Sequence, residues 1–259
     1  MKSFRVFLEM IKFEHTIFAL PFAYLGMFLA AKGWPTLAQF FWVTVAMAAA
    51  RTAAMSFNRF IDRYLDARNP RTANRPIQAG RISATAVGMA AVASLFVLGF
   101  AAWQLNTFVF MLWPGAIFFL VSYSYTKRFT WLCHFALGFT DGLAPLGAWA
   151  AITGSLLAPA DWPAWLLLGA VTVWIGGFDI LYALQDIEVD RRDGLHSIPA
   201  RFGVPASLWV ARVCHIATVA VLIAVGLITG LGWPYWFGLI VVAALFIYEH
   251  RLISPADLS

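Results

Sequence analysis

Asn58-Arg-Phe-Ile-Asp62-Arg-Tyr-Leu-Asp66 is the stretch around which this sequence is organised. An amide and two carboxylates recur at four-residue spacing, directly after a long apolar segment, so a helix would carry all three on one face. Carboxylates that share a helix face repel one another unless a cation neutralises them. The stretch therefore predicts a cation-binding helix end.

The composition excludes an ordinary soluble domain. Of the 259 residues, 61% are hydrophobic and 12% are charged, whereas about a quarter of the residues in soluble domains are charged. A transmembrane helix needs about 20 mostly apolar residues. We therefore expect an all-α, polytopic transmembrane helical bundle that forms a single domain over residues 1–259. Its eight spans are expected at about 16–31, 37–57, 84–103, 107–124, 131–153, 164–184, 206–229 and 234–248.

The basic residues alternate between the loops. The N-terminus and the segments after the second, fourth, sixth and eighth spans are rich in Lys and Arg, and the other loops are poor in them. Basic loops stay in the cytoplasm, so the pattern places both termini and the basic segments on that side. The net charge of +5 is thereby explained without a nucleic-acid partner. The expected location is the inner (cytoplasmic) membrane, with multiple passes.

A second acidic stretch follows the sixth span and reads Asp179-Ile-Leu-Tyr182-Ala-Leu-Gln-Asp186-Ile-Glu-Val-Asp190. Asp186 lies 124 positions after Asp62, and both stretches fall on the predicted cytoplasmic side. This spacing predicts two four-helix halves, about 1–125 and 126–259, whose like ends meet over one cavity.

The two acidic stretches suit a hard divalent cation. Mg²⁺ binds one or two carboxylates and often bridges them to the phosphates of a substrate, so the stretches point to a diphosphate. The alternative is that the acids form salt bridges with interleaved arginines on a solvated loop. Basic residues on the same side are candidates for binding phosphate oxygens, namely Lys12, Arg63, Arg71, Arg75, Lys127 and Arg128.

Three ionisable residues fall inside predicted spans: Arg51, Asp141 and Asp179. Charges within a membrane normally face a bundle interior or a watery cavity, which makes them candidates for a functional site. Arg51 lies seven residues before Asn58, on nearly the same helix face, where an anionic group of a second substrate would meet it. The alternative is that Arg51 and Asp141 pair with each other or cap breaks in the helices.

Both acidic stretches, together with Arg71-Thr-Ala-Asn-Arg75-Pro, resemble the motifs of the UbiA superfamily of membrane prenyltransferases. Phe18-Ala-Leu-Pro-Phe22, Lys127-Arg128 and Gly194-Leu-His-Ser-Ile-Pro199 are similar to the 4-hydroxybenzoate polyprenyltransferase branch and its relatives in menaquinone synthesis. The resemblance covers essentially the whole chain. It implies nine transmembrane helices around a central cavity, whereas eight spans are visible here and the last one is expected to be missing.

The resemblance also implies roles for individual residues. The metal, Mg²⁺, would be held by Asn58, Asp62, Asp66, Asp179, Asp186 and Asp190, and the four acids Asp62, Asp66, Asp186 and Asp190 would be catalytic. The substrates would contact Lys12, Arg63, Arg71, Arg75, Lys127 and Tyr182, and Arg51 is added to these contacts from its position within a span rather than from the resemblance.

The function implied is Mg²⁺-dependent transfer of a polyprenyl group from a polyprenyl diphosphate to an aromatic acid in quinone biosynthesis. The acceptor is expected to be 4-hydroxybenzoate, toward ubiquinone, with 1,4-dihydroxy-6-naphthoate, toward menaquinone, as the alternative. A rival from another class is a cation-coupled secondary transporter, whose acids are expected near the bilayer midplane rather than at span ends. Prenyl chain length and oligomeric state are left open by the sequence.

Overall fold

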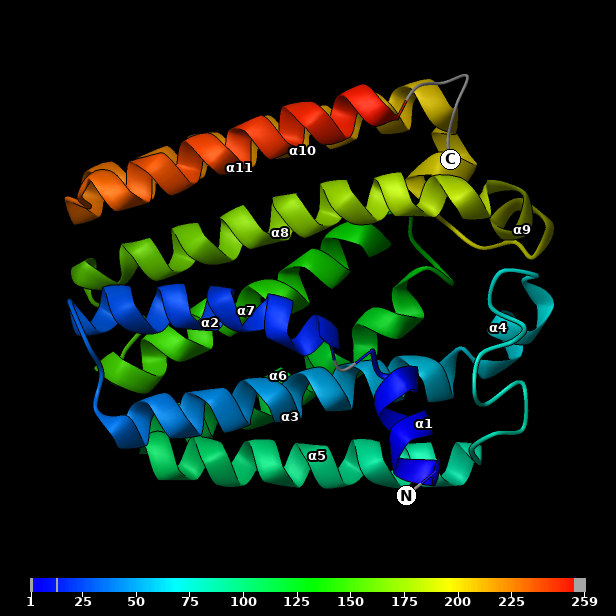
Figure 1. Ribbon diagram of the computed structural model, residues 1–259, viewed down its shortest axis with the longest axis horizontal. Helices are drawn as coiled ribbons and strands as arrows, with labels where there is room; N and C mark the ends of the chain where they lie inside the picture. The colour runs from blue at the N-terminus through cyan, green and yellow to red at the C-terminus, as the bar shows by residue number, and fades with distance from the viewer. Residues whose placement is uncertain (1, 13, 254–259) are drawn as a thin grey trace. The chain divides into compact units, whose positions relative to one another are not determined.

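The computed structural model describes the backbone of residues 2–12 and 14–253 and the side chains of residues 5–12 and 20–253. Within these ranges the protein is built of helices, without a strand (Figure 1), which confirms the predicted all-α class. In chain order the elements are α1 (Lys2–Met10), α2 (Glu14–Ala31), α3 (Leu37–Ile61), α4 (Arg63–Arg68), α5 (Ala84–Leu105), α6 (Thr107–Thr126), α7 (Cys133–Thr153), η1 (Pro159–Asp161), α8 (Trp162–Ala183), η2 (Leu184–Asp186), α9 (Ile187–Arg192), α10 (Ile198–Thr229) and α11 (Trp233–Leu252).

Eight of these helices fall on the eight expected spans: α2, α3, α5, α6, α7, α8, α10 and α11. Seven have the length and hydropathy needed to cross a membrane, and α2 has a shorter apolar stretch, Leu20–Ala31, among the described residues. The ninth helix of the resemblance stays untested, because residues 254–259 lie outside the described part of the chain.

The start of α10 differs from the prediction. The helix begins at Ile198 rather than near residue 206, because Ser197 caps it by accepting the Ala200 N–H and Pro199 fits its first turn. Gly203, at φ 79° and ψ 176°, kinks the helix five residues later. Only glycine adopts this conformation readily. The seventh span therefore has a helical extension within the segment that was expected to be a polar loop.

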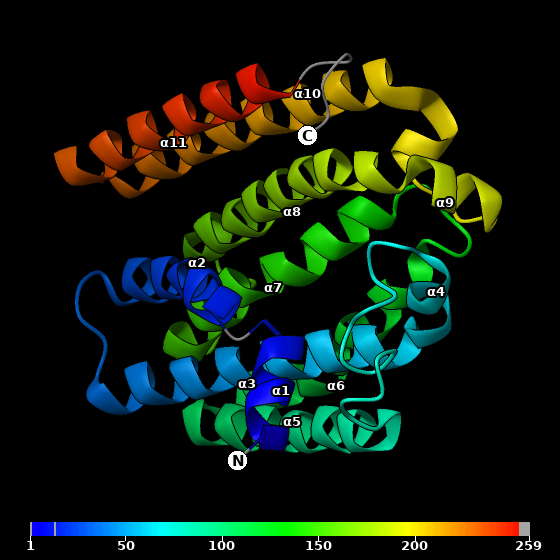
Figure 2. The same ribbon diagram turned by 45° about the vertical axis from the view of Figure 1, so that its right-hand side comes forward.

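The chain separates into two compact units. One contains Met1–Tyr125 and Ala144–Leu156, and the other contains Thr126–Leu143 and Leu157–Ser259. In the first unit α3 packs against α5 and α2, and in the second α10 packs against α8 and α11 (Figure 2). The single-domain organisation with two pseudo-halves stays a prediction.

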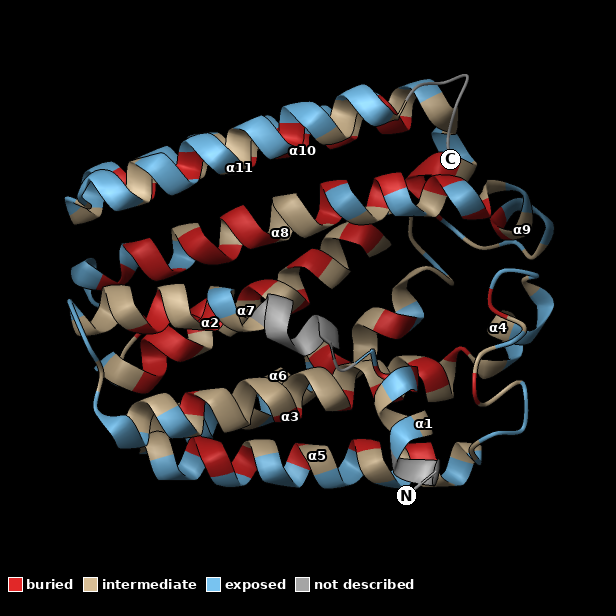
Figure 3. Cartoon of the chain, viewed as in Figure 1, coloured by how far each residue is buried: buried red, intermediate tan, exposed pale blue. Residues whose placement is uncertain are grey.

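Burial differs among the helices. Half of the apolar window is buried in α7 and in the segment that contains α8, against 11% in α6 and in α11. Figure 3 shows the difference as red turns on α8 and mostly pale blue turns on α11. Hydrocarbon solvates exposed apolar side chains, and a helix satisfies its own backbone hydrogen bonds, so the exposed faces of α6 and α11 suit contact with lipid.

Small residues allow close helix contacts within each unit. A Cβ atom added to Gly138 of α7 would lie 2.2 Å from the carbonyl oxygen of Thr172 in α8. A Cβ atom at Gly26 of α2 would lie at the same distance from the carbonyl oxygen of Pro145 in α7. Such contacts let helix backbones approach closely in membrane proteins.

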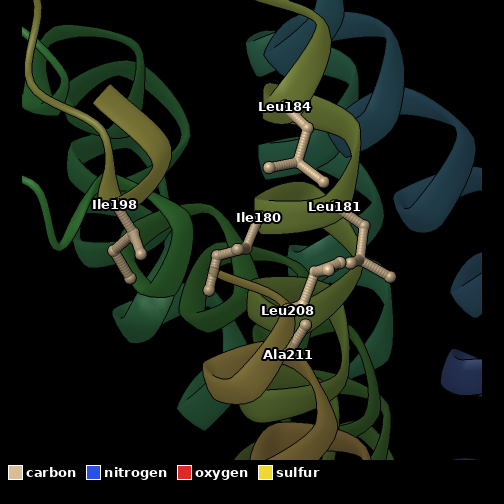
Figure 4. Close-up of a cluster of buried hydrophobic side chains, with 6 residues drawn as sticks. All are labelled: Ile180, Leu181, Leu184, Ile198, Leu208 and Ala211. Carbon is tan, nitrogen blue, oxygen red and sulfur yellow. The ribbon is translucent and has the colours of Figure 1, made fainter. Parts of the chain in front are cut away.

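Two apolar clusters hold the acidic stretches. Ile180, Leu181 and Leu184 of the second stretch pack against Ile198, Leu208 and Ala211 at the start of α10 (Figure 4). In the first unit, Ile77 and Ile82 of the segment after α4 pack on a cluster of Met10, Ile11 and Val87. Apolar packing therefore anchors both the second acidic stretch and the segment that follows α4.

Candidate functional site

The first acidic stretch bends where α3 meets α4. Asp62 ends α3 and precedes α4 with φ −89° and ψ 6°, in the sparsely populated bridge region. The Asp62 N–H donates to the Asn58 carbonyl and the Asp66 N–H donates to the Asp62 carbonyl, at 2.9 and 2.8 Å. The Asn58 Nδ2 donates to Asp62 Oδ2 at 3.0 Å. The predicted juxtaposition of Asn58 with Asp62 is therefore present, and Asp66 lies on the next helix.

Two residues that sequence reasoning missed surround Asn58. Arg59 Nη1 donates to Asn58 Oδ1 at 3.2 Å, and Asn58 Nδ2 lies 3.4 Å from Ser124 Oγ. Both Arg59 and Ser124 are buried. The sequence showed Arg59 as one of several loop arginines and Ser124 as the end of a span, so neither carried a signal of its own.

Asp66 forms an ion pair with Arg75. Arg75 Nη1 lies 2.6 Å from Asp66 Oδ2, with both side chains largely covered. Thr72 Oγ1 donates to the Asp66 carbonyl at 2.8 Å, and Gln78 Nε2 donates to the Arg63 carbonyl at 2.9 Å. The segment after α4 therefore folds back on the acidic stretch, and it brings a cation to a predicted metal ligand.

Three further basic candidates of the first unit are Arg63, Arg71 and Lys12. Arg63 donates to the Phe60 carbonyl at 2.6 Å, and its guanidinium lies over the rings of Phe60 and Tyr64. Arg71 is exposed, and its backbone N–H donates to the Asn69 side chain. Lys12 is exposed just after α1.

Arg51 lies within α3, where the sequence placed it. Its Nε is buried and has no hydrogen-bond partner among the described residues. A buried guanidinium nitrogen without a partner costs free energy unless a ligand satisfies it. Arg51 thus has an unused donor on the helix that leads to Asn58.

The second acidic stretch repeats the bend of the first. After α8 ends at Ala183, Asp186 takes φ −110° and ψ 6° between η2 and the six-residue helix α9. Asp186 and Asp190 are both buried, at 8% and 1% exposure. The single helix face predicted for Asn58, Asp62 and Asp66 is therefore interrupted at Asp62, and the second stretch is interrupted in the same way at Asp186.

Lys127 pairs with the last acid of this stretch. Its Nζ lies 3.1 Å from Asp190 Oδ1, while Asp190 Oδ2 is buried with no hydrogen-bond partner among the described residues. Burial alone would lower the pKa of Lys127, but the attraction and hydrogen bond of Asp190 outweigh it, so the pKa is raised above its ordinary value. Lys127 is accordingly charged at neutral pH.

Asp179 and Tyr182 lie on the more open side of α8. His134 Nδ1 lies 2.7 Å from Asp179 Oδ2, and the Asp179 side chain is 30% exposed. Tyr182 is also exposed, and its ring is stacked on that of Phe178. The contact of His134 with Asp179 had no visible signal in the sequence.

The arrangement of the acids determines how they could hold the implied metal. Among the residues that the structure describes, no group of three or more His, Cys, Asp or Glu side chains is close enough to hold a metal ion. Mg²⁺ typically takes one or two protein carboxylates and completes its shell with water and substrate phosphates. Two spaced carboxylates in each stretch, with an unpartnered buried oxygen on Asp190, fit that mode of binding rather than a closed protein cage.

Comparison with known proteins agrees with the fold and the motifs. The model of the UbiA prenyltransferase family matches residues 19–259. A 4-hydroxybenzoate octaprenyltransferase from Nitrosospira multiformis is 33% identical over 233 residues, which cover 90% of this chain and 78% of the relative. A UbiA homolog from Aeropyrum pernix superposes with a TM-score of 0.87 at 34% identity, over 92% of this chain and 88% of that chain.

A further solved structure, a UbiA homolog from Archaeoglobus fulgidus bound to DMAPP and Mg²⁺, has the same fold. Its TM-score is 0.72 at 20% identity, over 95% of this chain and 86% of that chain. The apolar helices and the two acidic helix ends thus define a multi-pass membrane protein of the prenyltransferase class. The chain belongs to the UbiA prenyltransferase family, and the resemblance drawn from its motifs is confirmed.

Proposed function

We propose that this protein transfers a polyprenyl group from a polyprenyl diphosphate to a ring carbon of 4-hydroxybenzoate, in ubiquinone biosynthesis. The observation that carries the proposal is its similarity to the Nitrosospira multiformis 4-hydroxybenzoate octaprenyltransferase over most of both chains. The buried acids at two helix ends supply the anionic groups that such a reaction needs around a metal-bound diphosphate.

The proposed diphosphate site uses the acids of both stretches. Asn58, Asp62, Asp66, Asp179, Asp186 and Asp190 would hold Mg²⁺, which supplies positive charge to the leaving diphosphate when bound. Arg75 and Lys127 already lie beside Asp66 and Asp190, so their charged groups are within reach of phosphate oxygens at the same acids. Lys12, Arg63, Arg71 and Tyr182 are proposed as further substrate contacts.

The reaction breaks the allylic C–O bond of the donor and a C–H bond of the acceptor ring, and it forms one C–C bond. The bond between the allylic C1 and the diphosphate oxygen breaks, and the diphosphate leaves with the electron pair. A ring carbon activated by the phenolic hydroxyl then attacks C1, and loss of the ring proton restores aromaticity. Basic side chains around the leaving group stabilise the charge that develops there, which is the main source of catalysis in such transfers.

Arg51 is proposed to bind the acceptor carboxylate. Its buried Nε lacks a partner, and a guanidinium binds a carboxylate through two parallel hydrogen bonds. Because Arg51 lies about two helical turns before Asn58, it is about 10 Å deeper along α3 than Asn58. That separation leaves room for an aromatic ring between a carboxylate and the reacting end of the donor.

The proposed location is the inner membrane with the acids on the cytoplasmic side. The basic residues in and just after α1, after α3, after α6, after α8 and at the end of α11 support this orientation. Polyprenyl tails are apolar, so the donor would reach the protein from the bilayer.

The deciding experiment supplies purified protein in lipid nanodiscs with Mg²⁺, one polyprenyl diphosphate and either acceptor. We expect a prenylated product from 4-hydroxybenzoate and little from 1,4-dihydroxy-6-naphthoate. Preference for the two-ring acceptor would overturn the proposed substrate, and cation flux into proteoliposomes without prenyl transfer would overturn the enzyme assignment.

A further inference from the structure

The His134 ring joins three helices of the second unit. It lies in the first turn of α7 and is 2% exposed. Its Nδ1 is 2.7 Å from Asp179 Oδ2 on α8, and its Nε2 accepts the Ile198 backbone N–H at 3.2 Å from the start of α10. Both ring nitrogens therefore have a partner, and one of these partners is a carboxylate of the second acidic stretch.

These two contacts determine which ring nitrogen carries the hydrogen. The first N–H groups of a helix have no intrahelical acceptor, and Ser197 satisfies only that of Ala200. The Ile198 N–H donates to Nε2, so that nitrogen offers its lone pair and the neutral ring carries its hydrogen on Nδ1. The Nδ1–H then donates to Asp179 Oδ2. The start of α10 thus sets the tautomer that binds the acid.

We propose that His134 is a positioning residue that fixes the Asp179 carboxylate within the site. This inference rests on the proposed function, in which Asp179 is one of the acids around the diphosphate. His134 is buried while the Asp179 side chain is 30% exposed, so the histidine holds one carboxylate oxygen from the protein interior. A site acid whose rotamer is locked by a buried hydrogen bond binds its ligand with less reorganisation.

The same short segment also supports Lys127. The His196 N–H donates to the Lys127 carbonyl at 2.7 Å, and Cys133 Sγ lies 3.3 Å from the His196 carbonyl. Lys127 in turn pairs with Asp190. The residues from His196 to Ile198 therefore fix the partners of two acids, Asp179 through the His134 ring and Asp190 through Lys127.

Two amide variants distinguish the hydrogen bond that orients Asp179 from the packing of the His134 ring. His134→Asn places an amide N–H near the position of Nδ1 and keeps a donor for Asp179. His134→Gln reaches the position of Nε2 and loses that donor. We expect His134→Gln to raise the Mg²⁺ concentration for half-maximal activity by about tenfold or more, as is typical when a residue that orients a metal ligand is removed, and His134→Asn to raise it less. Equal effects of the two variants would overturn the proposal.

His215→Gln is the matched control, because His215 is equally buried and contacts His250 rather than an acid of the stretch. We expect it to leave the Mg²⁺ dependence unchanged. In an Asp179→Ala background, His134→Gln should have little further effect on activity, because residues that act through one contact are not additive. A full additional loss in the double variant would show that His134 acts by another route.

A spectroscopic measurement tests the tautomer without turnover. In protein labelled with ¹⁵N-histidine, the His134 signals, identified by their loss in His134→Asn, should be those of a neutral ring protonated on Nδ1. A ring protonated on Nε2, or on both nitrogens, would overturn the inference. The measurement also separates this inference from the proposed function. A wild-type protein that shows the expected tautomer, perturbed by Asp179→Ala, but transfers no prenyl group would overturn the proposed function. The positioning of Asp179 by His134 would still stand.

Discussion

Asp62 and Asp186 have nearly the same backbone conformation, at φ −89° and ψ 6° and at φ −110° and ψ 6°. Each directly precedes a helix of six residues, α4 after Asp62 and α9 after Asp186. Bridge-region dihedrals are sparsely populated and are found at many active sites. The two positions that the sequence sets 124 residues apart are thus equivalent in local structure.

The equivalence predicts similar losses at both positions. Asp62→Ala and Asp186→Ala should each reduce prenyl transfer by about 100-fold or more, as expected for the loss of a group that stabilises developing charge. Initial rates at saturating Mg²⁺ measure the effect. Glu188→Ala is the control, because Glu188 is exposed on α9 and is not one of the proposed site acids. Normal activity of Asp62→Ala would exclude that residue from the site.

Arg75 is predicted to act on donor affinity. Arg75→Ala removes the ion pair with Asp66 and a charged group for phosphate, so the KM for the polyprenyl diphosphate should rise about tenfold, in line with the loss of one charge-assisted hydrogen bond. Arg81→Ala is matched to it, because Arg81 pairs with Glu9 on the exposed surface and its loss should have little effect. An unchanged donor KM for Arg75→Ala would restrict Arg75 to a structural role.

Lys127 is predicted to stabilise the second unit as well as to serve the site. Lys127→Met leaves the Asp190 carboxylate buried without its partner and should lower stability by about 3 kcal/mol. Asp190 raises the pKa of Lys127 despite burial. The stabilisation by the ion pair is therefore fully present below the ordinary lysine pKa of about 10.4. It is lost only as the pH rises through the higher pKa that Lys127 has in the folded protein. The difference in Tm between wild type and Lys127→Met should therefore be constant from about pH 7 to 9, and a difference that shrinks within this window would contradict the assignment.

Arg51 is predicted to act on the acceptor. Arg51→Gln should raise the KM for 4-hydroxybenzoate by about tenfold or more and leave the donor KM unchanged, because a charged hydrogen bond contributes roughly 1.5–3 kcal/mol. Thr52→Val is the control, since the Thr52 hydroxyl is satisfied by the Ala48 carbonyl. Equal rises in both KM values would place Arg51 near the diphosphate instead.

The contact of α7 with α8 predicts a stability effect at a glycine. Gly138→Ala would bring a Cβ atom to 2.2 Å from the Thr172 carbonyl oxygen. This overpacking should lower the stability of the protein by at least about 1–3 kcal/mol. Gly169→Ala on α8 meets no atom within 4 Å and should be neutral or slightly stabilising. Thermal unfolding in detergent compares the two, and equal Tm values would argue against a tight contact.

Much of the fold followed from the sequence because hydropathy dictates where helices can span a membrane. The eight expected spans and the acidic stretches at helix ends needed only local composition. The start of α10 was missed because its first turn depends on Ser197, Pro199 and the positive φ of Gly203, in a segment whose charges suggested a loop. The periodicity of apolar residues does not predict a kink of this kind.

The candidate site was predicted less completely. The acids were found from their spacing, but Asp66 with Arg75 and Asp190 with Lys127 pair through the folding of loops, which four-residue spacing does not report. His134 contributes through its position between two other helices. A single buried histidine in an apolar helix has no pattern that distinguishes this role from packing.

The pairing of Asp66 with Arg75 and of Asp190 with Lys127 has a consequence for ligand entry. In each acidic stretch a basic side chain already neutralises one carboxylate, Arg75 that of Asp66 and Lys127 that of Asp190. If these acids hold a metal-bound diphosphate as proposed, the cation would offer a new partner to the carboxylate of each pair and the phosphate oxygens a new partner to the basic side chain. Joint binding of the cation and the diphosphate would leave every charged group of the two ion pairs with a partner of opposite charge. A metal ion that bound alone would leave the basic side chains without a partner, and a diphosphate that bound alone would leave the carboxylates without one.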